Sequence, residues 1–467
     1  MKVLSVVLIC TILSACHGYR ILGVFPFNGK SHFMMFEHLM KSLARKGHQV
    51  DVISTFPLKK PYPNYNDMIV LPAERQFMNN LTYNEIDTLF RDSVVFAVAS
   101  LAGNLVCEHL NNPQIQELIR NPPKDPPYDV IIMENMNFWE RMHNFLSIVS
   151  SKWQFNALSS EQTDIVRKYI SSDAPDIRQL EKKMSMILVN SHISINGIKD
   201  MTPAYIEVGG LHVQEEGVEL PASLEKWMNE STHGFVYFSF GSMVKIESFP
   251  MKHINIFYNS LGKIAPVRVL MKIAKPNELP PGLPKNVHVL PWIPQVKVLK
   301  DKNVKAFITH GGLMGTQEAI HYGVPMIGMP LFADQFINIA NYMRHNIAIA
   351  LELKTLTEEK MDNALNAILN DPKYRDTAQK LSQKFRDRPL SAEDTAVYWT
   401  EYIVRHGANA LRSPAMNLTW WQIELLDVYA VFLFAMLAVL YLIATAIPFM
   451  YNLATSPDSG SRKKKVS

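Results

Sequence analysis

The densest set of residues able to do chemistry lies at positions 291–335 of the 467-residue chain. An apolar run ending in Thr309 leads into a His-Gly-Gly sequence at 310–312, and a helix is expected to begin near Gly315. Glycines let a ligand approach the backbone closely, and the amides of a helix N-terminus favour an anion. Because His310 can also donate to a phosphate oxygen, the segment predicts a phosphate-binding turn between a strand and a helix.

The same segment carries side chains suited to a nucleotide and a sugar. Trp292 offers a flat face on which a base can stack. Glu318, Asp334 and Gln335 supply carboxylate and amide groups that bind sugar hydroxyls. Taken alone, each of these residues also occurs in ordinary loops and helix caps. Their combination at short spacing predicts a site for a sugar nucleotide.

Short apolar strands alternate with amphipathic helices along both halves of the chain. In the first half, strands are expected at 20–25 and 49–54, joined by a helix from about Ser31 to Lys46 that ends at Gly47. In the second half, the expected strands are FVYFSF, VRVLMK, NVHVL, KAFIT, PMIGM and AIALEL. This pattern predicts two α/β domains with doubly wound parallel sheets, joined by a hinge region at 203–221.

The segment at 291–335 closely resembles the signature of the UDP-glycosyltransferase family. The matching pattern is F-I-T-H-G-G, a later Glu, G-V-P and P-L-F-x-D-Q. The resemblance also covers FVYFSFGSMV, IEVGGLHV and most of the remaining chain, and it is greatest to insect members. It implies two facing Rossmann-like domains of the GT-B type. The acceptor-binding domain would be 19–205, and the domain for the UDP-sugar, which is a co-substrate and not a cofactor, would be 206–427.

The resemblance also implies a role for each donor-side residue. The uracil and the ribose would be held by Trp292, Gln295 and Glu318. The diphosphate would be bound by Ser242, His310 and the backbone around Gly312 and Gly315. The transferred sugar would be bound by Asp334 and Gln335. One departure is Met314, where many relatives have Asn, so one polar phosphate contact is replaced.

On the acceptor side, the family places a general-base His just after the first strand, and the matching residue is His32. A His at a helix N-terminus is held in its neutral form, which suits it to remove the proton of an acceptor hydroxyl. Glu134, where many relatives have Asp, would orient the ring. Residues 136–146 resemble a segment that usually comes much later, so the N-terminal domain is expected to be internally shortened.

Two functions from different classes remain open from the sequence. The first is an inverting transfer of a hexose, expected to be glucose, to a hydroxyl of small lipophilic acceptors, as in detoxification. Metal is not expected, since no two aspartates stand two positions apart as in metal-dependent transferases. The second is a non-catalytic UDP-binding relative that modulates an active enzyme in a homo- or hetero-oligomer, which the shortening favours.

The two ends of the chain predict its location. Residues 1–18 have the pattern of a signal peptide, and 428–447 form an uncharged run long enough to span a bilayer. The tail at 448–467 is basic and ends in a dilysine-like signal, so we expect a type I protein of the endoplasmic reticulum membrane. Asn80, Asn229 and Asn417 begin luminal sequons.

The composition excludes two classes of protein. A net charge of +4 lacks the basic excess that a nucleic-acid binder uses for phosphate contacts, and three cysteines are too few for a disulfide scaffold.

Overall fold

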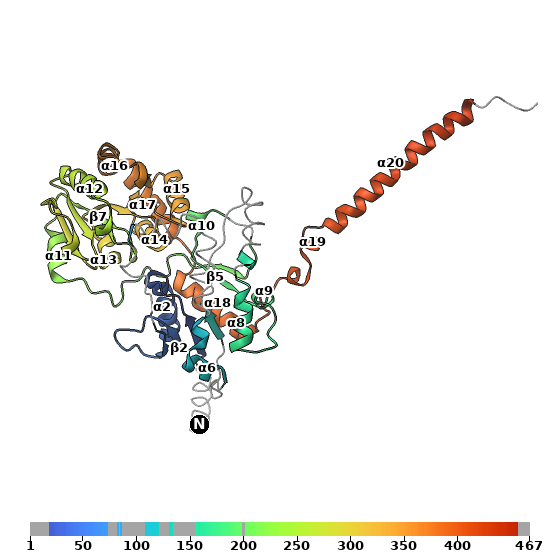
Figure 1. Cartoon of the computed structure of the whole chain (residues 1–467), viewed down its shortest axis with the longest axis horizontal. Helices are drawn as coiled ribbons and strands as arrows, with labels where there is room; N and C mark the ends of the chain where they lie inside the picture. Colours follow the sequence, from blue (N-terminus) through green and yellow to red (C-terminus); the bar gives the residue numbers. More distant parts are fainter. Residues whose placement is uncertain are drawn as a thin grey trace, which may run out of the picture. The chain divides into compact units, whose positions relative to one another are not determined.

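The computed structural model describes residues 18–72, 82–83, 85, 108–120, 130–133, 155–157, 159–198 and 201–455. The chain divides into two compact units, Met1–Leu411 and Arg412–Ser467. The first unit contains the two α/β halves expected from the sequence, each with a parallel sheet (Figure 1). The expected signal peptide, Glu134 and the basic end of the tail lie outside the described residues.

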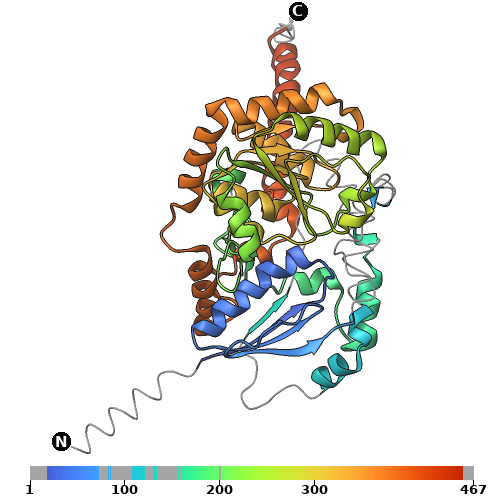
Figure 2. The same ribbon diagram turned by 90° about the vertical axis from the view of Figure 1, so that its left-hand side faces the viewer.

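The N-terminal half is built on a four-stranded parallel sheet. Its spatial order is β3-β2-β1-β4, with strands β1 (Arg20–Phe25), β2 (Gln49–Ser54), β3 (Tyr65–Val70) and β4 (Val130–Met133). Helix α2 (Lys30–Arg45) crosses the sheet in blue in Figure 2 and buries Phe33, Met40 and Leu43 at three- and four-residue spacing. The helix begins and ends one residue earlier than expected. Gly47 follows it with φ +92°, a conformation that favours glycine.

The C-terminal half contains a six-stranded parallel sheet. In spatial order its strands are β12 (Ala348–Ala350), β11 (Met326–Gly328), β10 (Val304–Thr309), β7 (Phe235–Ser239), β8 (Arg268–Lys272) and β9 (Val287–Leu290). This is the doubly wound Rossmann order, in which the chain starts in the middle and adds strands first on one side and then on the other. The direction in which strands are added therefore reverses between β7 and β10.

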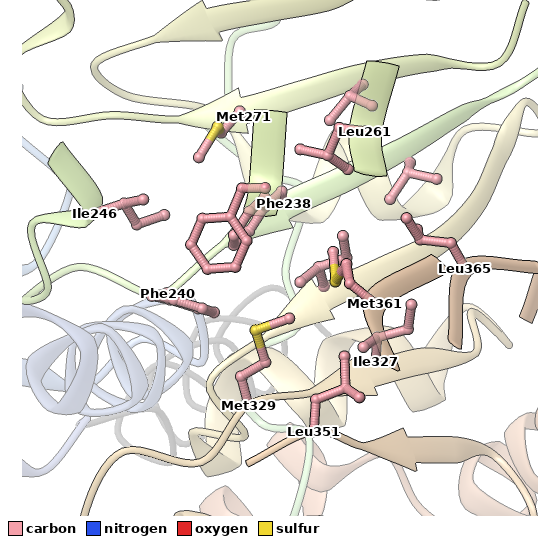
Figure 3. Close-up of a cluster of buried hydrophobic side chains, with 14 of the residues drawn as sticks. Phe238, Phe240, Ile246, Leu261, Met271, Ile327, Met329, Leu351, Met361 and Leu365 are labelled. Atoms are coloured by element: carbon pink, nitrogen blue, oxygen red, sulfur yellow. The ribbon is translucent and has the colours of Figure 1, made fainter. Parts of the chain in front are cut away.

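Both faces of β7 are buried, because helices cover the sheet on each side. Val236, Phe238 and Phe240 face one core cluster, which includes Met271 and Met329, and Figure 3 shows the two Phe rings within it. Phe235 and Tyr237 alternate with them and face a second cluster. Side chains alternate across a strand, so the continuous apolar run FVYFSF is what a strand covered on both faces requires.

The remaining elements of the first unit are helices and a short second pair of parallel strands. Those before the C-terminal sheet are η2 (Glu108–Asn111), α6 (Pro113–Arg120), α8 (Glu161–Tyr169), α9 (Ile177–Glu181), β5 (Ile187–Val189), α10 (Ile193–Asn196), β6 (Tyr205–Glu207) and α11 (Ala222–Asn229). Those within it or after it are η3 (Ile246–Ser248), α12 (Met251–Lys263), η4 (Pro276–Glu278), α13 (Gln295–Lys300), α14 (Leu313–His321), α15 (Gln335–Arg344), η5 (Leu353–Thr355), α16 (Glu358–Asn370), α17 (Pro372–Arg386) and α18 (Ala392–His406).

Helix α18 comes late in the chain but completes the core of the N-terminal half. Its Ala396 and Val397 belong to the same buried cluster as β1, β2 and α2. His48 Nε2 lies 3.0 Å from Glu401 Oε1, and Arg45 pairs with Glu393 at 2.5 Å. The chain therefore crosses back to its first domain before it enters the second unit.

The second unit contains η6 (Pro414–Asn417), α19 (Trp420–Ile423) and α20 (Leu426–Thr455). Within α20, residues Leu426–Pro448 form a stretch of 23 residues with a mean hydropathy of 2.6. That length and composition are sufficient to cross a membrane. The predicted span, 428–447, lies inside this stretch.

Candidate donor and acceptor site

Two matching turns stand at the point where the strand order reverses. After β7, the Gly241 amide donates to Ser239 Oγ at 3.2 Å, and after β10 the Gly311 amide donates to Thr309 Oγ1 at 3.2 Å. The two turns carry Ser242 and His310 at the carboxyl ends of neighbouring strands. In doubly wound sheets, ligands bind in this place.

The His310 ring lies between two glycines. A Cβ atom at Gly241 or at Gly312 would come within 2.7 Å of the ring, so only glycine leaves room for it. Burial lowers the pKa of His310 to about 4, and the charge of Lys272 acts in the same direction. Several buried polar side-chain atoms of the described residues have no hydrogen-bond partner, and two of them, His310 Nδ1 and Ser242 Oγ, lie in these two turns. Buried polar atoms are normally partnered, so these two fit a polar ligand.

Helix α14 begins directly after this turn. It starts at Leu313 with Gly312 as its N-cap, two residues earlier than expected, so Gly315 lies inside the first turn. A Cβ atom at Gly315 would stand 3.0 Å from Gln295 Nε2. The glycine therefore lets the Gln295 side chain pass close to the helix.

Gln295 and Glu318, which the sequence assigns to the ribose, are directly bonded. Gln295 Nε2 donates to Glu318 Oε2 at 2.7 Å, and Tyr237 Oη donates to Gln295 Oε1 at 3.0 Å. Glu318 is only 4% exposed, and this burial raises its pKa to about 7, although the bond from Gln295 acts the other way. The carboxyl can thus gain or lose its charge near neutral pH.

Trp292 lies beside a lysine that the sequence analysis did not single out. The Trp292 side chain is 50% exposed, as a face that stacks on a base must be. Lys272 Nζ lies 5.8 Å from the Trp292 ring centroid and donates to the Gly241 carbonyl at 2.9 Å. Burial lowers the pKa of Lys272 to about 8, while Glu247 opposes the shift. A lysine that ends the apolar run VRVLMK is the signal that could have identified it.

Asp334 and Gln335 follow β11 and begin α15. Gln335 Oε1 accepts from the amides of Leu331 and Phe332, at 2.9 and 3.1 Å, and so holds the loop before the helix. Asn338 Nδ2 donates both to Asp334 Oδ2 at 2.7 Å and to the Gly311 carbonyl at 3.0 Å. Asp334 is thereby tied to the turn that carries His310. Sugar binding by these two residues stays a prediction.

His32 lies in the first turn of α2 and is exposed to solvent. Its ring packs edge-on to Phe27 with 5.1 Å between centroids, and Phe27 in turn packs against the core of the C-terminal half. The protein packed around the ring desolvates it and so lowers the pKa of His32, and the charge of Asp334 partly opposes this. The predicted base therefore senses the carboxylate predicted to bind the sugar, although the two belong to different halves.

Glu134, predicted to orient His32, lies outside the described residues. The strand before it, β4, runs parallel to β1 with Met133 level with Val24. In the chain, Glu134 is thus the residue that comes directly after the carboxyl end of the strand next to β1. In the described part of the chain, no group of three His, Cys, Asp or Glu side chains is placed to hold a metal ion.

Comparison with known proteins decides the family. A model described as UDP-glucuronosyl and UDP-glucosyl transferase matches residues 69–459. The chain belongs to this family. It is therefore a UDP-glycosyltransferase, an enzyme that uses a UDP-sugar as donor. The resemblance inferred from residues 291–335 is confirmed.

Individual relatives come from insects and mammals. UDP-glucosyltransferase 2 of Dactylopius coccus is 32% identical, and the match covers 99% of each chain. UDP-glucuronosyltransferase 2B17 of Homo sapiens is 31% identical, over 86% of this chain and 77% of that protein. The Dactylopius alignment has 527 positions, whereas 99% of 467 residues is about 462, so about 65 positions of the relative have no counterpart here.

Solved structures confirm the fold. Arabidopsis thaliana UGT89C1, complexed with UDP-L-rhamnose, aligns with a TM-score of 0.59 at 16% identity, over 83% of this chain and all of that one. The glycosyltransferase VinC, in complex with DTDP, aligns with a TM-score of 0.57 at 16% identity, again over 83% of this chain. The predicted GT-B arrangement of two Rossmann-like halves is therefore correct.

Proposed function

We propose that this UDP-glycosyltransferase moves glucose from UDP-glucose to a hydroxyl of small lipophilic acceptors, with inversion at the anomeric carbon. The observation that carries the proposal is the pair of buried polar atoms without partners, Ser242 Oγ and His310 Nδ1, at the reversal point of the sheet. The choice of glucose follows one insect relative, which is named UDP-glucosyltransferase 2.

His32 acts as the general base in this proposal. A neutral imidazole is required to accept the acceptor proton, and the lowered pKa of His32 keeps it neutral at pH 7. As the acceptor oxygen attacks the anomeric carbon from the face opposite UDP, the proton passes to His32 and the bond to the diphosphate breaks. The Asp334 carboxylate, whose charge favours the imidazolium, stabilises the protonated ring.

The departing UDP gains negative charge, which this chain's own groups offset. Lys272 contributes a cation near Trp292, and the N-terminus of α14 contributes backbone amides. Trp292 stacks on uracil, Gln295 and Glu318 hold the ribose, and Gln335 with Asp334 contacts the sugar. These groups supply the charge stabilisation without a metal ion.

The test compares UDP-glucose with UDP-glucuronate as donors for simple phenols, using the full chain in membranes. We expect a β-glucoside from UDP-glucose and much slower transfer of glucuronate. His32→Ala should lower turnover by about 10²-fold or more, a typical general-base contribution, and leave UDP binding intact. His233→Ala, which removes an exposed histidine from the turn before β7, is the control. Equal turnover in His32→Ala and the parent would contradict the assignment.

A non-catalytic role is the second candidate, and the missing positions favour it. The relative has about 65 aligned positions that this chain lacks, and the sequence places the shortening after Glu134, in the acceptor half. The deciding experiment inserts a relative's segment between Glu134 and Met136. Transfer gained in that chimera, and abolished by His32→Ala, would identify an impaired enzyme. A chimera that binds UDP without transfer would support a partner that modulates an active relative.

We further propose a type I location in the endoplasmic reticulum membrane, with both α/β halves in the lumen. The apolar stretch Leu426–Pro448 and the lysines after it support this orientation. Asn229 and Asn417 are exposed, as glycan acceptors must be. Glycosidase treatment of the expressed protein should therefore increase its gel mobility.

A further inference from the structure

A buried histidine of the hinge phrase contacts the donor helix from behind. His212 is 0% exposed, and its Nε2 lies 2.9 Å from the carbonyl oxygen of Met314, in the first turn of α14. The same nitrogen lies 3.7 Å from Glu318 Oε1. The other carboxylate oxygen, Oε2, accepts from Gln295. His212 thus faces the side of Glu318 that Gln295 leaves open.

The protonation state of His212 follows from these contacts. Burial lowers its pKa to about 4, although the bond to Met314 opposes the shift, so the ring is neutral near pH 7. A carbonyl can only accept, so the single ring proton is on Nε2. His38 and His321 face His212 and also disfavour its charge, and the only carboxylate within 4 Å in the described residues is Glu318.

A second side chain of α14 joins the helix to the same hinge. Gln317 Oε1 accepts from the Gly210 amide at 3.0 Å, and Gln317 Nε2 donates to the Asn190 carbonyl at 3.2 Å. The helix whose N-terminus faces the phosphate site is therefore held at two successive turns by the segment between the two sheets. A shift of that segment would move both Met314 and Glu318.

We propose that His212 is a positioning residue for donor binding, which fixes the first turn of α14 through Met314 and holds Glu318 toward the ribose. It does not touch the substrate. Its N–H dipole beside Oε1 also favours the carboxylate over the carboxylic acid. The other titratable groups that sense Glu318 are Tyr237 and Tyr322. Both are neutral near pH 7, as tyrosines ordinarily are, and burial raises their pKa values further. This inference rests on the proposed UDP-sugar site.

The test uses two amides of different length. The side-chain nitrogen of Gln reaches about as far as His Nε2, whereas that of Asn reaches only as far as Nδ1. His212→Asn should therefore lose the bond to Met314, and His212→Gln should keep it. We expect His212→Asn to weaken UDP-glucose binding at pH 7 by about tenfold, the size of one lost hydrogen bond. Affinity for UDP-glucose should fall at acid pH as Glu318 gains its proton, and we call this fall the acid limb of the binding profile. In His212→Asn we expect the acid limb to move to a pH higher by about one unit.

His253 provides a matched control. It too is a buried histidine whose Nε2 faces a backbone carbonyl, that of Leu353 at 3.0 Å, but it lies in α12 away from Glu318. His253→Asn and His253→Gln should leave the affinity for UDP-glucose and the acid limb unchanged. A purely structural effect of losing a buried histidine would lower thermal stability in both pairs and shift the acid limb in neither.

The outcomes separate this inference from the proposed function. The inference would be overturned if His212→Asn kept the affinity and the pH profile of the parent. It would also be overturned if the Asn and Gln variants behaved alike. In both cases the proposed UDP-sugar site would stand. If His212→Asn does not fold, His212→Met gives the same comparison, because it also lacks the donor. If the parent binds no UDP-glucose, the proposed site fails. The inference is then tested by infrared spectroscopy. The carboxylic-acid band that Glu318→Gln removes belongs to Glu318, and its intensity is followed as a function of pH. If the midpoint of that titration is the same in His212→Asn as in the parent, the inference is overturned.

Discussion

Binding of UDP-glucose should follow a bell-shaped pH profile, because two groups in the donor site titrate close to neutrality. Glu318, with a pKa of about 7, must lose its proton to accept hydrogen bonds from the ribose hydroxyls. Lys272, with a pKa of about 8, must keep its proton to attract the diphosphate. Affinity should therefore rise from acid pH, reach a maximum between these two values, and fall at higher pH.

The size of the effect follows from the two ionised fractions. At pH 6 about one tenth of Glu318 is ionised, and at pH 9 about one tenth of Lys272 is charged. At pH 7.5 each group is about three-quarters in its binding form, so about 0.6 of the molecules have both. If only those molecules bind, affinity at pH 7.5 exceeds that at pH 6 or pH 9 by about sixfold.

Isothermal titration calorimetry with UDP-glucose measures this profile directly. UDP-glucose is preferable to UDP because both of its phosphates are esterified and stay ionised over the whole range. Glu318→Gln should abolish the acid limb and keep the basic one, and Lys272→Gln should do the reverse. A flat profile in the parent would refute the reasoning. An acid limb that survives in Glu318→Gln would show that a different group titrates.

Four further predictions test the donor site and the topology. Trp292→Ala should weaken UDP binding by about tenfold or more in calorimetry, because stacking on a base contributes about 1–3 kcal/mol; unchanged affinity would remove Trp292 from the site. Gly312→Ala should raise the donor KM, since its Cβ would lie 2.7 Å from His310 Nε2. Gly262→Ala, whose Cβ would stand 3.6 Å from Pro284 in ordinary contact, should not. Protease added to intact microsomes should trim only the tail, and Lys464→Ser with Lys465→Ser should let the protein reach the Golgi. Digestion of the bulk, or no redistribution, would contradict the orientation or the retrieval signal respectively.

Much of the fold could be predicted from the sequence because its signals are local. The run FVYFSF is apolar at every position but one and forms β7, which is buried on both faces. The helix between the first two strands repeats its apolar residues every three or four positions and forms α2. Glycines after β7 and β10 mark turns with φ of +74° and +88°. Such patterns report which side of an element is buried and where it must turn.

The donor site was predictable for a related reason. Its residues follow one another closely in the chain, from Trp292 to Gln335, so a single segment carries the motif. The bond between Gln295 and Glu318 joins two neighbouring helices of that segment. A short stretch of chain thus holds most of the residues assigned to the nucleotide.

Only the tertiary structure decided which distant residues join that segment. Lys272 reaches the site because β7 and β8 pair in parallel with Phe238 level with Met271, which places the lysine beside the turn after β7. His212 meets Glu318 because the hinge packs behind α14, and His32 senses Asp334 because Phe27 packs on the C-terminal core. These contacts depend on strand order, register and the packing of one half on the other. No local pattern of apolar and polar residues encodes them, since side-chain periodicity is the same whichever neighbour an element has.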